Sequence, residues 1–263
     1  MSEVMKLIDV SKCTGCRGCQ LACKQWNQQP AKQTKNRGTY QNPPSLQANT
    51  WTLIRFQEIA DKDGVKWLFR KDGCMHCTDA ACVKVCPSGA LYYSDFGTVG
   101  INHERCIGCK ECVSACPFEI PKYDRDTDKV YKCDLCLSRI EVDLIPACIK
   151  ACPTGALRFG EKKAMLKTAY ARAEELGGDA NVYGDKFVDG THVVYVLPEK
   201  PGVYDELPSH PRVPLSIILW KDVLKPLSLL AAGGVLAGAF LHYIIHGPKT
   251  PDDDQTNRSE GGE

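Results

Sequence analysis

The chain has 263 residues, which is enough for one large domain or two small ones around a sizeable core. Its 33 Lys and Arg nearly balance its 32 Asp and Glu, so no basic excess points to a nucleic-acid partner. The 16 cysteines are the unusual feature, and disulfides, zinc sites or iron–sulfur clusters could account for them.

The cysteines fall into four groups of four, and none is left over. The first and third groups read C-x2-C-x2-C-x3-C, whereas the second and fourth have a longer gap before their third cysteine. A proline follows the last cysteine of every group except the first. In chain order the groups are Cys13, Cys16, Cys19 and Cys23; Cys74, Cys77, Cys82 and Cys86; Cys106, Cys109, Cys112 and Cys116; and Cys133, Cys136, Cys148 and Cys152.

This spacing favours iron–sulfur clusters. Disulfides usually join distant parts of a chain, but most of these cysteines are separated by only two to four residues, and residues 1–6 carry no apolar signal segment. A zinc-bound structural module uses paired C-x2-C knuckles, yet it seldom has three cysteines in one tight turn followed by a fourth and a proline. Because thiolates are the soft, anionic ligands that iron–sulfur clusters require, the groups predict an electron carrier.

Between the groups, the pattern predicts short strands. The segment 24–73 is an insertion, polar and Pro-rich at first and then strand-like over Trp51–Ile59 and Val65–Arg70. We expect it to cover the clusters or to meet a partner. Leu91–Tyr93 and Val99–Ile101 predict a hairpin between the second and third groups.

After the fourth group, Glu161–Leu176 contains strong helix formers and ends at two glycines, so it predicts a helix. Val193–Leu197 predicts a strand. The prolines that follow indicate a linker over residues 201–225.

The stretch Pro226–Ile245 contains no formally charged side chain. At about 1.5 Å per residue a helix here spans about 30 Å, one hydrocarbon thickness. Trp220 and Tyr243 lie where interfacial aromatic residues belong. A buried core helix is the alternative, but a linker precedes the stretch and a polar acidic tail (246–263) follows it, which leaves little chain to bury it. The sequence therefore predicts a single membrane anchor.

The expected fold class is α+β, with two interlocked ferredoxin-like two-cluster units plus one C-terminal transmembrane helix. The expected divisions are the first cluster motif and insertion (1–73), the second ferredoxin-like unit (74–120), the fourth cluster motif with a helix and a strand (121–200), the linker (201–225), the transmembrane helix (226–245) and the tail (246–263).

The cysteines can be assigned to clusters by pairing the groups. In two-cluster ferredoxins the last cysteine of a group binds the other cluster. The second and third groups are close enough to form one such unit, which by elimination leaves the first and fourth groups as the other. A sequential pairing, first with second and third with fourth, is not excluded by spacing alone. The nested pairing gives ligand set 1 (Cys13, Cys16, Cys19, Cys152), ligand set 2 (Cys74, Cys77, Cys82, Cys116), ligand set 3 (Cys86, Cys106, Cys109, Cys112) and ligand set 4 (Cys23, Cys133, Cys136, Cys148).

No catalytic site emerges from the sequence. His76 lies between two cysteines and is better explained as a hydrogen-bond donor than as a ligand. Lys150 either raises the potential of a nearby cluster or is simply solvated. His242 is an ionisable group in an apolar span, which favours a hydrogen bond to a neighbouring helix or a haem propionate over axial haem ligation.

Several stretches outside the cysteine groups carry a family resemblance. They are Lys6-Leu7-Ile8-Asp9, Tyr40-Gln41-Asn42-Pro43-Pro44, Arg70-Lys71-Asp72-Gly73-Cys74-Met75-His76-Cys77, Gly190-Thr191-His192-Val193, Leu219-Trp220-Lys221 and Leu224-Lys225-Pro226-Leu227. Together with the cysteine groups and the apolar span, they resemble the iron–sulfur (beta) subunit of membrane-bound respiratory formate dehydrogenase. That family belongs to the four-cluster subunits of molybdopterin oxidoreductases.

The resemblance implies a complex of three kinds of subunit. A catalytic alpha subunit with a molybdenum or tungsten pterin centre oxidises formate, this chain takes the electrons, and a gamma subunit with b haems passes them to quinone. Family members use the nested pairing of cysteine groups. Some relatives, such as nitrate reductase, replace one cysteine and hold a [3Fe–4S] cluster, but here every position is Cys, so four [4Fe–4S] clusters are expected.

The resemblance also implies a place in the cell inner membrane, with lipid around the single helix and the cluster domain on the periplasmic side. Charges do not fix this orientation, because Lys221 and Lys225 flank one end of the apolar span and Lys249 and Arg258 the other. The alternative within electron transfer is a subunit of a membrane-bound hydrogenase or of another molybdoenzyme. The alternative from another class is the zinc-bound structural module.

Overall fold

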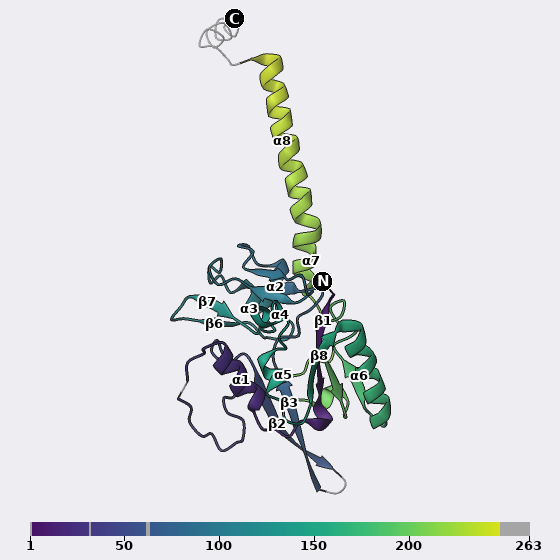
Figure 1. The fold of residues 1–263 in the computed structure, drawn as a ribbon. Helices are drawn as coiled ribbons and strands as arrows, with labels where there is room; N and C mark the ends of the chain where they lie inside the picture. Colours follow the sequence, from purple (N-terminus) through teal and green to yellow (C-terminus); the bar gives the residue numbers. More distant parts are fainter. Residues whose placement is uncertain (1, 32, 62–63, 248–263) are drawn as a thin grey trace, which may run out of the picture. The chain divides into compact units, whose positions relative to one another are not determined.

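The computed structural model describes residues 2–31, 33–61 and 64–247. The chain divides into two compact units, the first ending at Pro214 and the second beginning at Leu215. The first unit mixes short helices and strands, whereas the second is helical (Figure 1).

A four-stranded sheet joins the two ends of the first unit. Its strand order is β8-β1-β10-β9, with β8 at Leu157–Glu161, β1 at Val4–Asp9, β10 at Val193–Leu197 and β9 at Asn181–Tyr183. The β1 strand pairs in parallel with β10 and antiparallel with β8. Because a parallel pair needs a long connection, most of the first unit lies between β1 and β10 in the chain.

The two faces of this sheet contact different groups, because successive side chains of a strand point to opposite sides. Leu7 of β1 packs with Ala169 and Ala173 of α6 (Lys162–Leu176). Ile8 points to the other face and belongs to the main core, which includes several cysteines. One face of the sheet therefore meets a helix and the other meets the cysteine-rich region.

Three two-stranded hairpins complete the strands described here: β2 with β3, β4 with β5, and β6 with β7. Their bounds are Leu53–Asp61 for β2, Gly64–Asp72 for β3, Leu91–Tyr93 for β4, Val99–Ile101 for β5, Lys122–Asp124 for β6 and Lys129–Tyr131 for β7.

The β2–β3 hairpin has an inner and an outer face. Residues opposite one another in register share a face, so Ile54 lies beside Lys71 and Phe56 beside Phe69. These residues form the inner face, where the Phe56 and Phe69 ring centroids are 5.2 Å apart and pack against the main core. The insertion thus covers part of the cysteine-rich region, one of the two roles that the sequence predicted for it.

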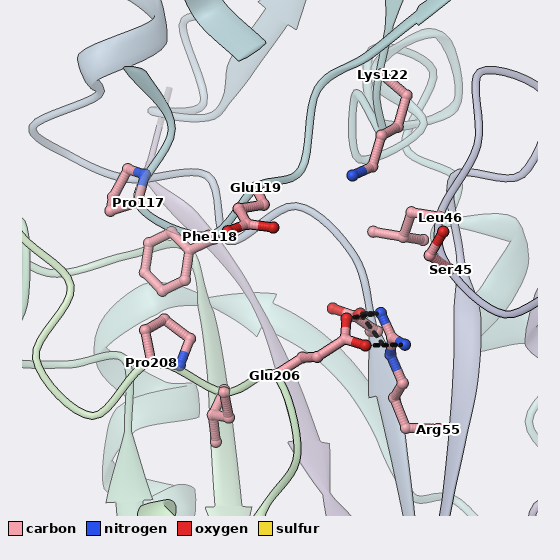
Figure 2. A pocket seen from close by; sticks show the side chains of 11 residues that line it. Ser45, Leu46, Arg55, Pro117, Phe118, Glu119, Lys122, Glu206 and Pro208 are labelled. Atoms are coloured by element: carbon pink, nitrogen blue, oxygen red, sulfur yellow. Dashed lines mark hydrogen bonds and ion pairs between the residues drawn. The ribbon is translucent and has the colours of Figure 1, made fainter. Parts of the chain in front are cut away.

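The outer face of the hairpin carries an ion-pair network (Figure 2). The Arg55 guanidinium lies 2.9 Å from the Asp72 carboxylate and 2.5 Å from the Glu206 carboxylate. These side chains line a cavity of about 530 Å³ together with Phe118 and Lys122. No cysteine is among the described residues that line this cavity, so it is separate from the thiol sites.

Short helices accompany the cysteine groups. They are α1 (Gly18–Trp26), α2 (Ala81–Lys84), α3 (Glu111–Ala115), α4 (Leu137–Ile140) and α5 (Ala147–Lys150). Two 3-10 turns, η1 (Val10–Lys12) and η2 (Pro201–Val203), complete the first unit.

The second unit is a helical segment that begins with α7 (Leu215–Ile218) and a π-helical turn, η3 (Leu219–Leu224). It continues as α8 (Lys225–His246), whose mean hydropathy is 1.8 in its most apolar window and whose residues are exposed. By length and composition, α8 can cross a membrane, and it includes the predicted span Pro226–Ile245. Residues 248–263 of the predicted tail, with Lys249 and Arg258, lie outside the described residues.

Most local predictions are confirmed. The hairpin of Leu91–Tyr93 with Val99–Ile101 and the strand Val193–Leu197 have the predicted bounds. The predicted helix from Glu161 begins one residue later, and the two strands of the insertion extend to Asp61 and Asp72. In the proline-rich stretch, Tyr204 and Leu207 are buried in the main core, so the chain belongs to the first unit up to Pro214.

Candidate iron–sulfur centres

The first and third cysteine groups share one backbone conformation. Gly15 and Gly108 have φ of +68° and +66°, and Arg17 and Lys110 follow with φ of 59° and 65°. A Cβ on Gly15 would lie 3.0 Å from an aromatic ring of the β2–β3 hairpin, and one on Gly108 would lie 2.4 Å from a backbone oxygen. Both positions therefore need glycine for conformation and for space. Arg17 and Lys110 are the residues immediately before α1 and α3.

Exposure also repeats between these two groups. The first cysteine is partly buried, the second is exposed and the third is buried, in Cys13, Cys16 and Cys19 and again in Cys106, Cys109 and Cys112. Each loop therefore carries its thiols from the surface to the interior. This repeat agrees with the matching spacing of the two groups in the sequence.

The second and fourth groups form another repeat. Each has a short helix, α2 or α5, before its last cysteine. The Ser88 hydroxyl lies 3.7 Å from the Cys86 sulfur, and the Thr154 hydroxyl lies 3.7 Å from the Cys152 sulfur. Gly89 and Gly155 both follow with φ of +65°. A strand begins next in each case, β4 or β8, so Cys86 and Cys152 occupy equivalent positions.

Helix packing shows which groups lie together. The α1 helix of the first group packs against α5 of the fourth, and α2 of the second group packs against α3 of the third. Each of these helices carries at least one cysteine of its group. The first and fourth groups are therefore neighbours, and so are the second and third.

Two cavities are lined by the thiols of one ligand set each. The four cysteines of ligand set 1 line one of them, together with the apolar side chains of Ile8, Ile54 and Leu157. All four cysteines of ligand set 3 line the other, with Ile101 and Val130 beside them. In each cavity, three thiols come from one group and the fourth is the last cysteine of another group, Cys152 or Cys86.

The thiols of the other two sets also lie together. Burial raises the pKa of Cys77, and the nearby thiols of Cys74, Cys116 and Cys82 raise it further. Within ligand set 4, burial and the nearby Cys133 thiol raise the pKa of Cys23 to about 12 and likewise raise the pKa of Cys136. Cysteine must be deprotonated to bind a metal. Bound iron would supply the positive charge that stabilises these buried thiolates.

Three buried clusters of residues each contain thiols of two ligand sets. The pairs are Cys19 with Cys148 for sets 1 and 4, Cys133 with Cys74 for sets 4 and 2, and Cys82 with Cys112 for sets 2 and 3. Leu53 and Ile120 also pack with Cys74 and Cys133. Under the nested pairing, neighbouring sets therefore follow the order 1, 4, 2, 3.

The donor chemistry fits iron–sulfur clusters. Across the residues that the structure describes, no three Cys, His, Asp or Glu side chains converge as closely as a single metal ion requires. A [4Fe–4S] cube places each thiolate on its own iron, so its four ligands stand farther apart than the ligands of one zinc ion. The cavities of sets 1 and 3, lined by four thiols and apolar side chains, suit such a cube.

Backbone and side-chain N–H groups donate to several of these sulfurs. The Leu135 N–H lies 3.4 Å from the Cys133 sulfur, and the Asn27 amide nitrogen lies 3.6 Å from the Cys23 sulfur. Thr52 also forms a side-chain hydrogen bond to Cys23 that opposes the rise in the pKa of that thiol. Such donors stabilise anionic sulfur and tune the potential of a cluster.

Sequence reasoning missed three buried lysines. Lys6, Lys71 and Lys132 are each 1% exposed, and all three come from segments next to cysteine groups. The Lys132 amine donates to the backbone oxygens of Val99 and Cys133. Strand alternation is the signal that could have identified Lys6, because it shares a face of β1 with Ile8.

The other singled-out residues have distinct surroundings. His76 is fully buried, and its Nδ1 accepts a hydrogen bond from the Val99 N–H at 3.1 Å. Lys150 is exposed, as expected of a solvated lysine. His242 stacks on His246 within α8, with ring centroids 4.3 Å apart. The role of His242 stays a prediction.

Family models match the chain in three places. Two matches are described as a 4Fe-4S dicluster domain, over residues 65–162 and 12–90. The third is described as formate dehydrogenase N, transmembrane, over residues 213–256. With the apolar helix α8, this last match indicates a single-pass membrane anchor. The two dicluster domains and 16 cysteines account for four [4Fe–4S] clusters.

Curated relatives match along nearly the whole chain. The formate dehydrogenase iron-sulfur subunit of Haemophilus influenzae is 44% identical over 98% of this chain and 85% of the relative. The nitrate-inducible formate dehydrogenase iron-sulfur subunit of Escherichia coli is 45% identical over 98% of this chain and 91% of the relative. Formate dehydrogenase 2 subunit beta (cytochrome c-553) of Nitratidesulfovibrio vulgaris is 38% identical over 76% and 95%.

The next conclusion rests on the all-cysteine donor sets, the dicluster domains, the membrane anchor and the sequence identity to these relatives. The chain belongs to the iron–sulfur subunits of formate dehydrogenase, and it is the electron-transfer subunit of that enzyme.

Proposed function

We propose that the chain conducts electrons from a catalytic subunit with a molybdenum or tungsten pterin centre to a membrane subunit with b haems that reduces quinone. The linear order of the ligand sets carries this proposal. Sets 1 and 3 lie at the two ends of that order, and each has one exposed cysteine, Cys16 or Cys109. Sets 4 and 2 lie between them and have none. End centres near the surface can exchange electrons with partners, whereas interior centres only relay them.

The proposed ligands are the four sets with nested pairing. Helix packing of α1 on α5 and of α2 on α3 supports that pairing over the sequential one. The two cavities support it independently, because each contains one thiol from a distant group. When bound, each cluster accepts and releases one electron, and the chain supplies the thiolates, the N–H donors and the apolar cover that set its potential.

The division of the chain follows from the same pairing. Segments 1–73 and 121–200 would form one two-cluster unit, and segment 74–120 would contribute the second, ferredoxin-like unit. The shared cluster of Leu53, Ile120, Cys74 and Cys133 supports an interlock between the two. The predicted linker 201–225 is replaced by core residues up to Pro214 and by helical turns from Leu215 to Leu224, which lead into the proposed transmembrane helix.

In the membrane, α8 would sit in lipid beside the b-haem subunit. We place the protein in the cell inner membrane with the cluster domain on the periplasmic side, on the strength of the family resemblance. Ending the chain after Pro214 should release an iron-loaded first unit from membranes, because the apolar helix is a separate compact unit. The side can be tested by comparing protease cleavage of the cluster domain in intact spheroplasts and in inverted membrane vesicles. Cleavage in spheroplasts but not in inverted vesicles is expected for the periplasmic side.

Metal analysis of the purified membrane complex tests the function. The expected result is at least sixteen non-haem irons per copy of this chain, four per cluster, with molybdenum or tungsten in a copurifying catalytic subunit. Visible absorbance should bleach when formate is added. Nickel in the partner would instead indicate a hydrogenase, and a colourless, zinc-loaded chain would indicate a structural module.

Cysteine substitutions test the pairing. Under nested pairing, Cys16→Ser and Cys152→Ser alter the same electron paramagnetic resonance (EPR) signal, because both belong to ligand set 1. Under sequential pairing, Cys152→Ser would instead alter the signal that Cys109→Ser alters. Cys16 and Cys109 are the exposed second cysteines of equivalent loops, so they serve as matched references for Cys152→Ser.

A further inference from the structure

Lys71 lies inside the protein at the end of strand β3. It faces Ile54 across the hairpin, on the inner face that packs against the main core. Both side chains line the cavity of ligand set 1, and Lys71 is only 1% exposed. Strand alternation explains this placement, because the neighbouring Arg70 and Asp72 point to the outer face.

The Lys71 amine has no nitrogen or oxygen partner among the described residues, and it is the one buried lysine amine there of which this is true. A buried ammonium without an acceptor is costly, and the Lys71 side chain lines the cavity that the four thiols of ligand set 1 also line. Ile54, which faces Lys71 across the hairpin, belongs to the buried core that contains Cys19 of set 1 and Cys148 of set 4. Lys71 therefore lies where sets 1 and 4 meet.

Lys6 reaches the same place from the four-stranded sheet. Burial and the nearby charge of Lys71 lower the pKa of Lys6. The sheet and the hairpin thus bring two lysines together beside the thiol sets, and Lys71 is the one that lines the cavity of ligand set 1.

The cavity of ligand set 3 provides a contrast. Its lysine is Lys110, which is exposed and lies over the Tyr123 ring, with 4.0 Å between the amine and the ring centroid. Near ligand set 2, Lys132 is buried, but its amine already donates to two backbone oxygens. Only the Lys71 amine is both buried and left without such acceptors among the described residues.

We propose that Lys71 is a positioning residue that donates a charge-assisted hydrogen bond to the cluster of ligand set 1 and raises the midpoint potentials of the clusters in sets 1 and 4. This inference rests on the proposed ligand sets. A fixed positive charge favours the reduced cluster, which is the more anionic form, and the effect is strong where water is excluded. Because Lys71 lies where the two sets meet, it raises the midpoint potentials of both clusters. Neither cluster then differs so much in potential from its neighbour that it holds the electron.

Redox titration of the intact membrane complex, followed by EPR, tests the proposal. Lys71→Met and Lys71→Gln should shift the set 1 signal to a more negative midpoint potential and the set 4 signal by less. Lys71→Arg should keep both near wild type, because it keeps the charge. The matched control is Lys150→Met, which lies in sequence between cysteines of the same two sets but is exposed, and it should shift neither signal. Cys16→Ser and Cys136→Ser identify the two signals.

The outcomes separate this proposal from the function itself. Unchanged midpoints in Lys71→Met and Lys71→Gln, with the wild-type non-haem iron content retained, would overturn the role of Lys71 and leave the ligand sets standing. Loss of about four irons in Lys71→Met but not in Lys71→Arg would support the same charge acting during cluster retention. Equal loss in both would mean that the residue only packs. A wild-type complex without iron would instead refute the proposed function.

Discussion

The two halves of the first unit hold thiols in the same pattern but surround them differently. Sets 1 and 4 lie against the four-stranded sheet and the β2–β3 hairpin, whose strands have nine residues each. Tyr195, Ile54 and Leu68 belong to one large core there. Sets 2 and 3 lie against two hairpins with three-residue strands and a smaller core of Leu91, Val99 and Val130. Spacing of cysteines thus decides where a cluster can bind, whereas the surrounding strands decide how much dry, charged or polar cover it receives.

Iron removal should give the largest difference between the two halves. Oxidation and chelation leave buried thiols without their metal, and the smaller half has less other core to keep it folded. Hydrogen exchange should lose protection over residues 74–131 while β1 and β10 amides stay protected, because the sheet and α6 pack through a core that contains no cysteine. Equal loss of protection in both halves would contradict the difference in cover.

The outer face of the hairpin offers a second test. Arg55→Met leaves the buried Asp72 carboxylate without its nearer cation, so the free energy of unfolding should fall by about 3 kcal/mol. The matched control is Lys66→Met on the same hairpin, because Lys66 forms a more exposed ion pair with Glu199 after β10; its loss should cost at most about 1 kcal/mol. Urea titration of the iron-loaded first unit measures the change in the free energy of unfolding for each variant. Equal changes would contradict the stronger role given to the Arg55–Asp72 pair.

A smaller effect should appear with pH. Burial lowers the pKa of His192, whose Nδ1 lies 3.0 Å from the backbone oxygen of His76 and whose Nε2 faces Glu3 and Lys162. The unfolded chain therefore binds a proton below about pH 6.5 that the folded chain binds only at lower pH. Stability is complete above that value and falls below it.

His192→Asn measures that contribution. The variant should flatten the dependence of the unfolding midpoint on pH between about 6.5 and 5, while the dependence at higher pH stays unchanged. His210, for which no such interaction with a strand is described, serves as the control position, and His210→Asn should leave the slope in place. A slope that survives His192→Asn would assign the acid sensitivity to other groups.

Much of the local structure was predictable from sequence. The hairpin after Cys86, the helix after Glu161 and the apolar span have strong periodicity or turn residues, and all are present. Resemblance to the formate dehydrogenase family could be recognised because the matching motifs extend beyond the cysteine groups. The matching conformations of Gly15 and Gly108 were likewise implicit in the repeated spacing.

Long-range features were not predictable in the same way. The parallel pairing of Lys6 with Val193 joins residues far apart in the chain, and no local pattern encodes it. The order of the sets depends on packing such as that of Cys133 and Cys74 in one buried cluster, which arises only when helices and hairpins come together. The burial of Lys71 was missed because lysine is normally a surface residue, and only its strand partner Ile54 reveals which way it points.

The nested pairing has a consequence for synthesis. Ligand sets 2 and 3 lie between Cys74 and Cys116, so their eight thiols leave the ribosome together and early. Ligand sets 1 and 4 begin with Cys13 and are complete only when Cys152 has emerged, and β10 joins β1 later still. With these sets, the clusters of sets 2 and 3 can be loaded while those of sets 1 and 4 are unfinished, and β1 must wait for β10 before the first unit closes.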